Sequence, residues 1–332
     1  MALFTGNKAL EALYAEVETP EAARSSYWEH EIQYVQMTAD GQLQGKSVLG
    51  SVSTKMGMLN SAAHWVLQAP FRRMGRGLKD FPECQRLGRL VARRQGRQFT
   101  HDMVRQTLSL AVIRQHADIT SEGPCNLIIG DGYGVMTSLA LLSSPLRKAI
   151  AVNLTRSLLL DLTYISKAVP DAGFALVTSP EDLAQALERP DIRLIAVQAD
   201  NAPMIENAPI SLAINVHSMQ EMDPPVIAGY FRILRANTAD RTLFYCCNKR
   251  VKELVDGSKA RFDDYPWHPD DQILVDEISA WSQMFYSKTP PFWHRRKGGD
   301  WATQHRLAYL HREKPFSFPL ECKKSTHNDL IQ

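Results

Sequence analysis

The chain has 332 residues, of which 44% are hydrophobic and 22% are charged, and its formal net charge is +2. This composition is typical of a soluble globular protein with one large domain, or one large and one smaller domain. No apolar run reaches the roughly 18 residues of a membrane span, and the N-terminus lacks the apolar core of a signal peptide. Five cysteines without paired spacing favour reduced thiols, and hence a cytoplasmic protein.

Residues 1–120 are predicted to form an N-terminal, mainly helical region. The composition of residues 11–18 and 21–37 is helical, whereas the Gly/Ser-rich residues 41–60 are expected to form a loop. Thr100–His116 begins with an N-cap residue and has an amphipathic pattern, so we expect a helix that leads into the next region.

From Cys125 onward, apolar strands alternate with helices. The expected strands are 126–129, 148–154, 174–178, 193–198, 211–216, 242–247 and 305–310. The expected helices are 135–142, 155–168, 181–187 and 224–234. This alternation predicts an α/β fold over residues 121–315, with a mostly parallel, Rossmann-like sheet covered by helices on both faces. The tail, residues 316–332, is expected to be poorly ordered.

The first predicted strand runs into a turn with glycines at alternate positions. The turn consists of Gly130, Asp131, Gly132, Tyr133 and Gly134, and a helix-like segment follows. A dinucleotide fold needs Gly-x-Gly-x-x-Gly, and neither Val135 nor Thr137 supplies the third glycine, which argues against a nicotinamide dehydrogenase. The spacing favours the loop that binds S-adenosylmethionine (SAM) in Rossmann-like methyltransferases. A structural turn without a ligand is the alternative interpretation.

Two further strand ends are predicted to contact this cofactor. Asn153, followed by Leu154, ends the second strand, where a doubly wound sheet places the ribose. Gln198 and Asp200 follow a later strand and are candidates for the adenine, with Ser179 as a competitor. Asn153 could instead cap the following helix.

The segment Ile214-Asn-Val-His-Ser-Met-Gln-Glu-Met222 resembles the fourth-strand signature of the sugar O-methyltransferase family. Weaker similarities extend over roughly residues 100–312. The resemblance implies a class I, SAM-dependent fold that methylates a hydroxyl of a glycan or a glycosylated natural product, with Asn215 at the cofactor. Acidic positions of the family are occupied here by Ile128 and Asn153, and a glycine by Asp131. A methyltransferase-like module that binds a partner or glycan without catalysis is therefore the alternative.

Removal of a hydroxyl proton during methyl transfer calls for a general base. His217, at the carboxyl end of the fourth strand, is the predicted base, and Glu221 is either its orienting partner or the competing base. Either residue could instead have a purely structural role.

A second polar group, comprising Asp263, Asp264, Trp267 and His268, is predicted to bind the sugar, with the indole stacked on the ring. The alternative is a solvated loop with one anchored aromatic residue. The carboxylates could also hold a divalent metal, although no spacing here is diagnostic of one.

Basic residues are concentrated between Phe71 and Arg97. They predict either a solvated helix face or contact with an anionic or lipid-linked acceptor or a membrane surface. Nucleic acid is not the expected partner, because interleaved aromatic residues are sparse. The sequence leaves open whether the chain forms a homo-oligomer.

Overall fold

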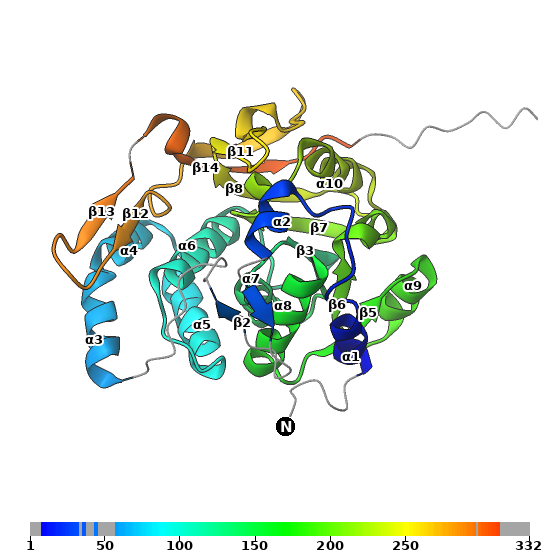
Figure 1. The fold of residues 1–332 in the computed structure, drawn as a ribbon, viewed down its shortest axis with the longest axis horizontal. Helices are drawn as coiled ribbons and strands as arrows, with labels where there is room; N and C mark the ends of the chain where they lie inside the picture. Colours follow the sequence, from blue (N-terminus) through cyan, green and yellow to red (C-terminus); the bar gives the residue numbers. More distant parts are fainter. Residues whose placement is uncertain (1–7, 33–34, 38–42, 46–56, 297, 313–332) are drawn as a thin grey trace, which may run out of the picture.

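The structure is a computed structural model that describes residues 8–32, 35–37, 43–45, 57–296 and 298–312. The predicted tail, residues 316–332, lies outside the described residues. The core is an eight-stranded sheet with strand order β11-β14-β8-β7-β3-β4-β6-β5 (Figure 1). The strands are β3 (Cys125–Ile129), β4 (Ala149–Asn153), β5 (Gly173–Val177), β6 (Ile192–Gln198), β7 (Ile210–Val216), β8 (Leu243–Lys249), β11 (Gln272–Ile278) and β14 (Thr303–Tyr309).

Six neighbouring strands, β8-β7-β3-β4-β6-β5, are parallel to one another. β14 lies between β8 and β11 and is antiparallel to both. Sheet order reverses at β3, because β4 lies on one side of it and β7 on the other. The carboxyl ends of these strands therefore meet at one edge, where open α/β sheets bind their ligands. The predicted Rossmann-like, mostly parallel sheet with helices on both faces is confirmed.

The two faces of the sheet bury alternate residues of the same strands. Ile128 packs into the hydrophobic cluster of one face, whereas Leu127 and Ile129 pack into that of the other. The first face is covered by α5 (Phe81–Arg94), α6 (His101–His116), α7 (Val135–Ser143) and α8 (Thr155–Ala168). The second face is covered by α9 (Pro180–Glu188), the 3₁₀ segment η2 (Ala199–Asn207) and α10 (Pro224–Ala236). Four cysteines of the described chain, Cys84, Cys125, Cys246 and Cys247, are buried and free.

The N-terminal region is helical but less so than predicted. Besides α5 and α6, its helices are α1 (Lys8–Ala15), α2 (Ser26–Ile32), α3 (Met58–Leu67) and α4 (Ala69–Met74). The helix expected over 21–37 is wrong at both ends, because α2 begins at Ser26 and β1 (Val35–Met37) pairs with β2 (Leu43–Gly45). Of the loop expected over 41–60, residues 41–42 and 46–56 lie outside the described residues, and its last residues are wrong because α3 begins at Met58. Leu13, Phe71 and Leu87 share one hydrophobic cluster with the sheet, so this region packs directly on the core.

Several small elements between β8 and β14 have no counterpart in the predicted pattern. They are β9 (Val251–Glu253) paired with β10 (Lys259–Arg261), and β12 (Met284–Tyr286) paired with β13 (Trp293–Arg295). The β12–β13 hairpin packs beside α3 at one end of the molecule, opposite α9 (Figure 1). No helix among the described residues is long and apolar enough to cross a membrane.

Candidate active site at the carboxyl edge of the sheet

A cavity of about 310 Å³ opens at the carboxyl edge of the sheet. Its walls come from the turns that follow β3, β4, β6 and β7, from α2 and α6, and from the segments that follow β8 and β13. Predicted site residues that line it are Gly130, Asp131, Gly132, Asn153, Leu154, His217 and Glu221. The cavity therefore brings together the predicted cofactor loop and both predicted general bases.

The glycine loop presents bare backbone to the cavity. Gly130 and Gly132 have φ of 66° and 75°, a region that residues with a Cβ rarely adopt. A Cβ at Gly130 would also lie 2.4 Å from the Oγ of Ser218. Both glycines are therefore required by the turn, Gly130 also by its close contact with Ser218, and both border the cavity.

The other half of the loop faces the protein interior. Tyr133 has an unusual φ of 137°, and its ring lies under the Arg97 guanidinium at 4.0 Å from the centroid. A Cβ at Gly134 would lie 2.3 Å from Ile165 in α8. Tyr133 and Gly134, both predicted to bind the cofactor, instead pack the loop against its neighbours.

A buried carboxylate that sequence reasoning missed holds this loop in place. Asp161, in α8, is 1% exposed, and its Oδ1 accepts hydrogen bonds from the backbone N–H groups of Tyr133 (2.7 Å) and Gly134 (2.9 Å). Its Oδ2 accepts from the Nδ2 of Asn153 at 2.8 Å. Burial, together with nearby Asp131, raises the pKa of Asp161 well above its usual range. A lone acid in the apolar run Leu158–Leu162 was the available signal.

Asn153 is therefore an oriented side chain. Its Nδ2 points to Asp161, and its Oδ1 accepts from the N–H of Leu154 at 3.0 Å. Asn153 does not cap α8, because its oxygen binds the N–H of Leu154, which precedes the helix. Contact with a ribose stays a prediction for a residue that lines the cavity.

Asp131 stabilises the start of the helix that follows the loop. Its carboxylate accepts from the N–H groups of Met136 (2.9 Å) and Thr137 (2.6 Å) at the beginning of α7. Burial raises the pKa of Asp131 despite these bonds. The acid at this position thus binds a helix terminus while it also borders the cavity.

The predicted adenine contacts are engaged by the N-terminal segment. Asp200 accepts from the N–H groups of Ala22 (2.8 Å) and Ala23 (2.7 Å), and the Nε2 of Gln198 donates to Glu16 at 2.7 Å. Neither Gln198 nor Asp200 lines the cavity, although their neighbour Ala199 does. Ser179 follows the edge strand β5 and caps α9, which removes it as a competitor.

Asn215 has a connecting role between strands. It is fully buried, donates from Nδ2 to the carbonyl of Ile129 at 2.9 Å, and accepts from Asn248 at 2.8 Å. It does not line the cavity. Its hydrogen bond to Ile129, the residue before the glycine loop, anchors the start of that loop.

His217 is held in a strained backbone conformation at the end of β7. Its φ is 64°, rare for a residue with a side chain, and such strain is concentrated at functional sites. Its N–H donates to the carbonyl of Cys247 at 2.8 Å. Burial, with help from Arg105 and Arg296, lowers the pKa of His217 to about 4.

Glu221 has the opposite shift. It ends the 3₁₀ segment η3 (Met219–Glu221), and burial raises its pKa to about 7, against the attraction of Lys252 and Lys249. A proton acceptor is most effective when its pKa lies near the working pH. Between the two predicted bases, Glu221 is better matched to neutral pH.

Basic side chains from four separate segments gather near these two residues. The cavity is lined by Arg105 from α6, Lys249 at the end of β8, Lys252 in β9, and Arg296 after β13. Arg105 is paired with Asp102 at 3.0 Å and donates to the carbonyl of Trp281 at 3.0 Å. These residues are far apart in the sequence, so no local motif predicts that they line one cavity.

The four residues predicted to bind the sugar lie outside this cavity. Asp263 pairs with Arg250 at 3.2 Å, and Trp267 packs on Phe231 with ring centroids 4.9 Å apart. His268 stacks on His311, which follows β14. Because β14 is antiparallel, its last residue Tyr309 pairs with the first residue of β8, at the opposite edge of the sheet.

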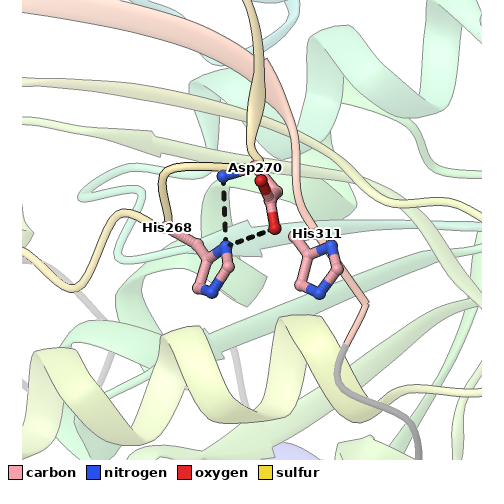
Figure 2. Close-up of side chains that lie close together, drawn as sticks. All are labelled: His268, Asp270 and His311. Carbon is pink, nitrogen blue, oxygen red and sulfur yellow. Dashed lines mark hydrogen bonds and ion pairs between the residues drawn. The ribbon is translucent and has the colours of Figure 1, made fainter.

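That opposite edge carries an exposed cluster, shown in Figure 2, of His268, Asp270 and His311. One ligand atom from each lies within 4.8 Å of the others, so among the described residues this group could hold a metal ion. The Nδ1 of His268 already accepts from the Asp270 N–H at 3.1 Å. The cluster is separate from the cavity and has no part in its chemistry.

Comparison with known proteins finds no matching family model and no matching curated protein. Solved structures with a similar fold include an O-methyltransferase family 2 protein from Planctomyces limnophilus in complex with apigenin (11% identity, TM-score 0.38, covering 93% of this chain and 94% of the other). SAM-dependent methyltransferases from Aquifex aeolicus (8% identity, TM-score 0.33, 61% and 89%) and Archaeoglobus fulgidus (8%, 0.33, 62% and 94%) are also similar. At these values the similarities assign neither a family nor a substrate.

Proposed function

We propose that this chain is a SAM-dependent methyltransferase that methylates a hydroxyl group of a sugar-containing acceptor. The observation that carries the proposal is the convergence of an open glycine loop, an oriented Asn153 and a residue suited to accept a proton, Glu221, on one cavity. The sugar specificity rests on the resemblance of residues 214–222 to a sugar O-methyltransferase signature.

The residues present fit such a cofactor. The bare backbone at Gly130 and Gly132 suits close approach of a ligand, and Asn153 and Leu154 follow β4, where a doubly wound fold places a ribose. When bound, SAM would supply an activated methyl group. Asn153 presents an amide where a carboxylate is more usual, so it offers fewer charge-assisted hydrogen bonds to a ribose.

The chain's own residues account for the rest of the reaction. The hydroxyl proton is taken by Glu221 in our proposal, with neutral His217 beside the acceptor as a weaker base. Trp28 from α2 forms part of the cavity wall and helps exclude water. Holding the acceptor oxygen in line with the methyl group supplies much of the remaining acceleration.

One observation favours a second candidate, a binding module without catalysis. The acid expected at the end of β4 is replaced by Asn153, and Asp200 is engaged by Ala22 and Ala23. Such a module would bind a partner or glycan but would not turn over.

Calorimetric titration of the protein with SAM and with S-adenosylhomocysteine tests the proposal. We expect both to bind, and Gly132→Val to weaken binding at least ~100-fold, because a β-branched residue is strained at a positive φ and would cover the open backbone. Gly257→Val is the matched control, since Gly257 also has positive φ (83°) but lies in an exposed turn. Absence of binding to the wild-type protein would refute the methyltransferase and leave the binding module.

A further inference from the structure

We infer that the acceptor carries an acidic group, a phosphate or a carboxylate, that binds to Lys249, Lys252 and Arg296. The inference rests on the proposed function and adds to it the charge of the substrate. Three elements, the end of β8, the β9 strand and the segment after β13, converge to bring these cations to the cavity.

The three cations lack a matching set of acids. Of the carboxylates that line the cavity, Asp102 pairs with Arg105, and Asp131 binds the start of α7. Among the described residues, no carboxylate lies within ion-pair distance of Lys249, Lys252 or Arg296. Glu221 is the acid left to balance them, and it must itself lose charge if it takes up a proton.

The cations also repel one another. Burial lowers the pKa of Lys249, and Lys252 and Arg296 lower it further because they disfavour its charged form, against the attraction of Glu221. The Lys252 ammonium rests over the Tyr27 ring, 4.3 Å from the centroid, rather than on an acid. An incoming anion would relieve this repulsion.

The cofactor strengthens the same requirement. If SAM binds as proposed, its sulfonium would add a positive charge to this partly buried cavity, where charges are weakly screened. A neutral acceptor would leave that charge facing three cations. An anionic acceptor balances it, while Trp28 offers an apolar wall for the body of the molecule.

Three sugars that differ in charge test the inference: glucose 6-phosphate, glucuronate and neutral glucose. Each is titrated by calorimetry into the protein saturated with S-adenosylhomocysteine. We expect one or both anions to bind at least ~10-fold more tightly than glucose, and the preferred anion to identify the phosphate or the carboxylate as the recognised group.

The double variant Lys249→Gln/Arg296→Gln should lose that preference, whereas Arg189→Gln/Arg232→Gln, at two exposed positions outside the cavity and the basic segment, should keep it. Binding of S-adenosylhomocysteine to the double variant shows that it is folded and separates this inference from the proposed function. The inference is overturned if neither anion binds more tightly than glucose to the saturated wild-type protein, or if the double variant retains the preference.

Discussion

Two groups of residues border the cavity: the glycine loop with Asn153, where we propose that the cofactor binds (the cofactor end), and Glu221 with Lys249 and Arg296, where we propose that the acceptor binds (the acceptor end). The two groups are built in different ways. At the cofactor end, polar groups are already hydrogen-bonded to one another within the protein. Asp161 accepts hydrogen bonds from the glycine loop and from Asn153, and Asp131 accepts from the first turn of α7. At the acceptor end, Glu221, Lys249 and Arg296 are brought together from separate elements and leave charge uncompensated. The comparison indicates that the first end is preorganised for a constant ligand and that the second end is completed by the acceptor.

The largest effect is expected from Glu221→Gln at the acceptor end. Loss of a positioned base typically lowers the rate by roughly 100- to 10,000-fold. We expect turnover to fall in that range while the affinity for S-adenosylhomocysteine changes less than about twofold, as measured by a methyl-transfer assay and calorimetry. His217→Gln is the matched variant, and a larger loss there would move the base to His217.

The pH dependence of turnover distinguishes the same two residues. The pKa of Glu221 is raised to about 7, so the fraction of deprotonated base, and with it the rate, should rise as the pH passes through about 7. If His217 is the base, its pKa of about 4 predicts a rise near that pH and a flat profile from 6 to 8. A flat profile in the wild-type enzyme would therefore contradict the assignment to Glu221.

Asp161→Ala tests the cofactor end. The change leaves the N–H groups of Tyr133 and Gly134 and the amide of Asn153 without their acceptor in the interior. Because each buried unsatisfied group costs about 1–3 kcal/mol, we expect a loss of about 3 kcal/mol in the free energy of unfolding and weaker cofactor binding. Chemical denaturation and calorimetry measure the two effects.

Thr163→Ala is the control for that variant, because the Thr163 hydroxyl is a buried group in the same helix that donates only to the carbonyl of Leu159. It should cost clearly less stability and leave cofactor affinity unchanged. Equal losses in the two variants would mean that the cofactor end is not held by Asp161.

The same difference explains which features could be predicted from sequence. The sheet, the glycine loop and Asn153 are encoded by neighbouring residues, because each strand runs directly into its turn. The role of Asp161 is harder to predict from sequence, because it depends on how α8 packs against the glycine loop. Lys249 and Arg296 come together only through the β12–β13 insertion.

Trp267 and His268 were predicted to bind the sugar but do not line the cavity, and the reason is topological. Both follow β8 in sequence, as a residue near the acceptor would, but the chain crosses to the other edge before β11. There Arg235 at the end of α10 donates to the carbonyl of Pro266 at 2.9 Å and binds Asp271 at 2.7 Å. Strand direction, which composition does not reveal, decides the edge.

Contact of the basic segment between Phe71 and Arg97 with an anionic acceptor or membrane stays a prediction. Several of its cations have internal partners: Arg94 donates to the carbonyl of Ala168 at 2.8 Å, and Arg86 pairs with Glu83 at 2.7 Å. The exposed Arg73, Arg76, Lys79 and Arg93 are the residues that could make such a contact.

The smallest effect is expected where the N-terminal segment meets the cofactor end. Glu21 accepts from the N–H (2.7 Å) and the hydroxyl (2.9 Å) of Thr155, and so caps α8 beside Asn153. Glu21→Gln removes the charge but keeps an acceptor, so we expect a loss of about 0.3–1 kcal/mol in the free energy of unfolding, the range of helix-end charges. Chemical denaturation measures it, with Glu18→Gln as control because Glu18 is an exposed partner of Arg156.

The same Glu21→Gln variant tests whether the N-terminal segment acts on the cofactor end alone. In that case, affinity for S-adenosylhomocysteine should fall a few-fold, while the charge preference among acceptors stays intact. A change in that preference instead would show that the two ends are coupled through the segment, since Ser25 also donates to the carbonyl of Glu221.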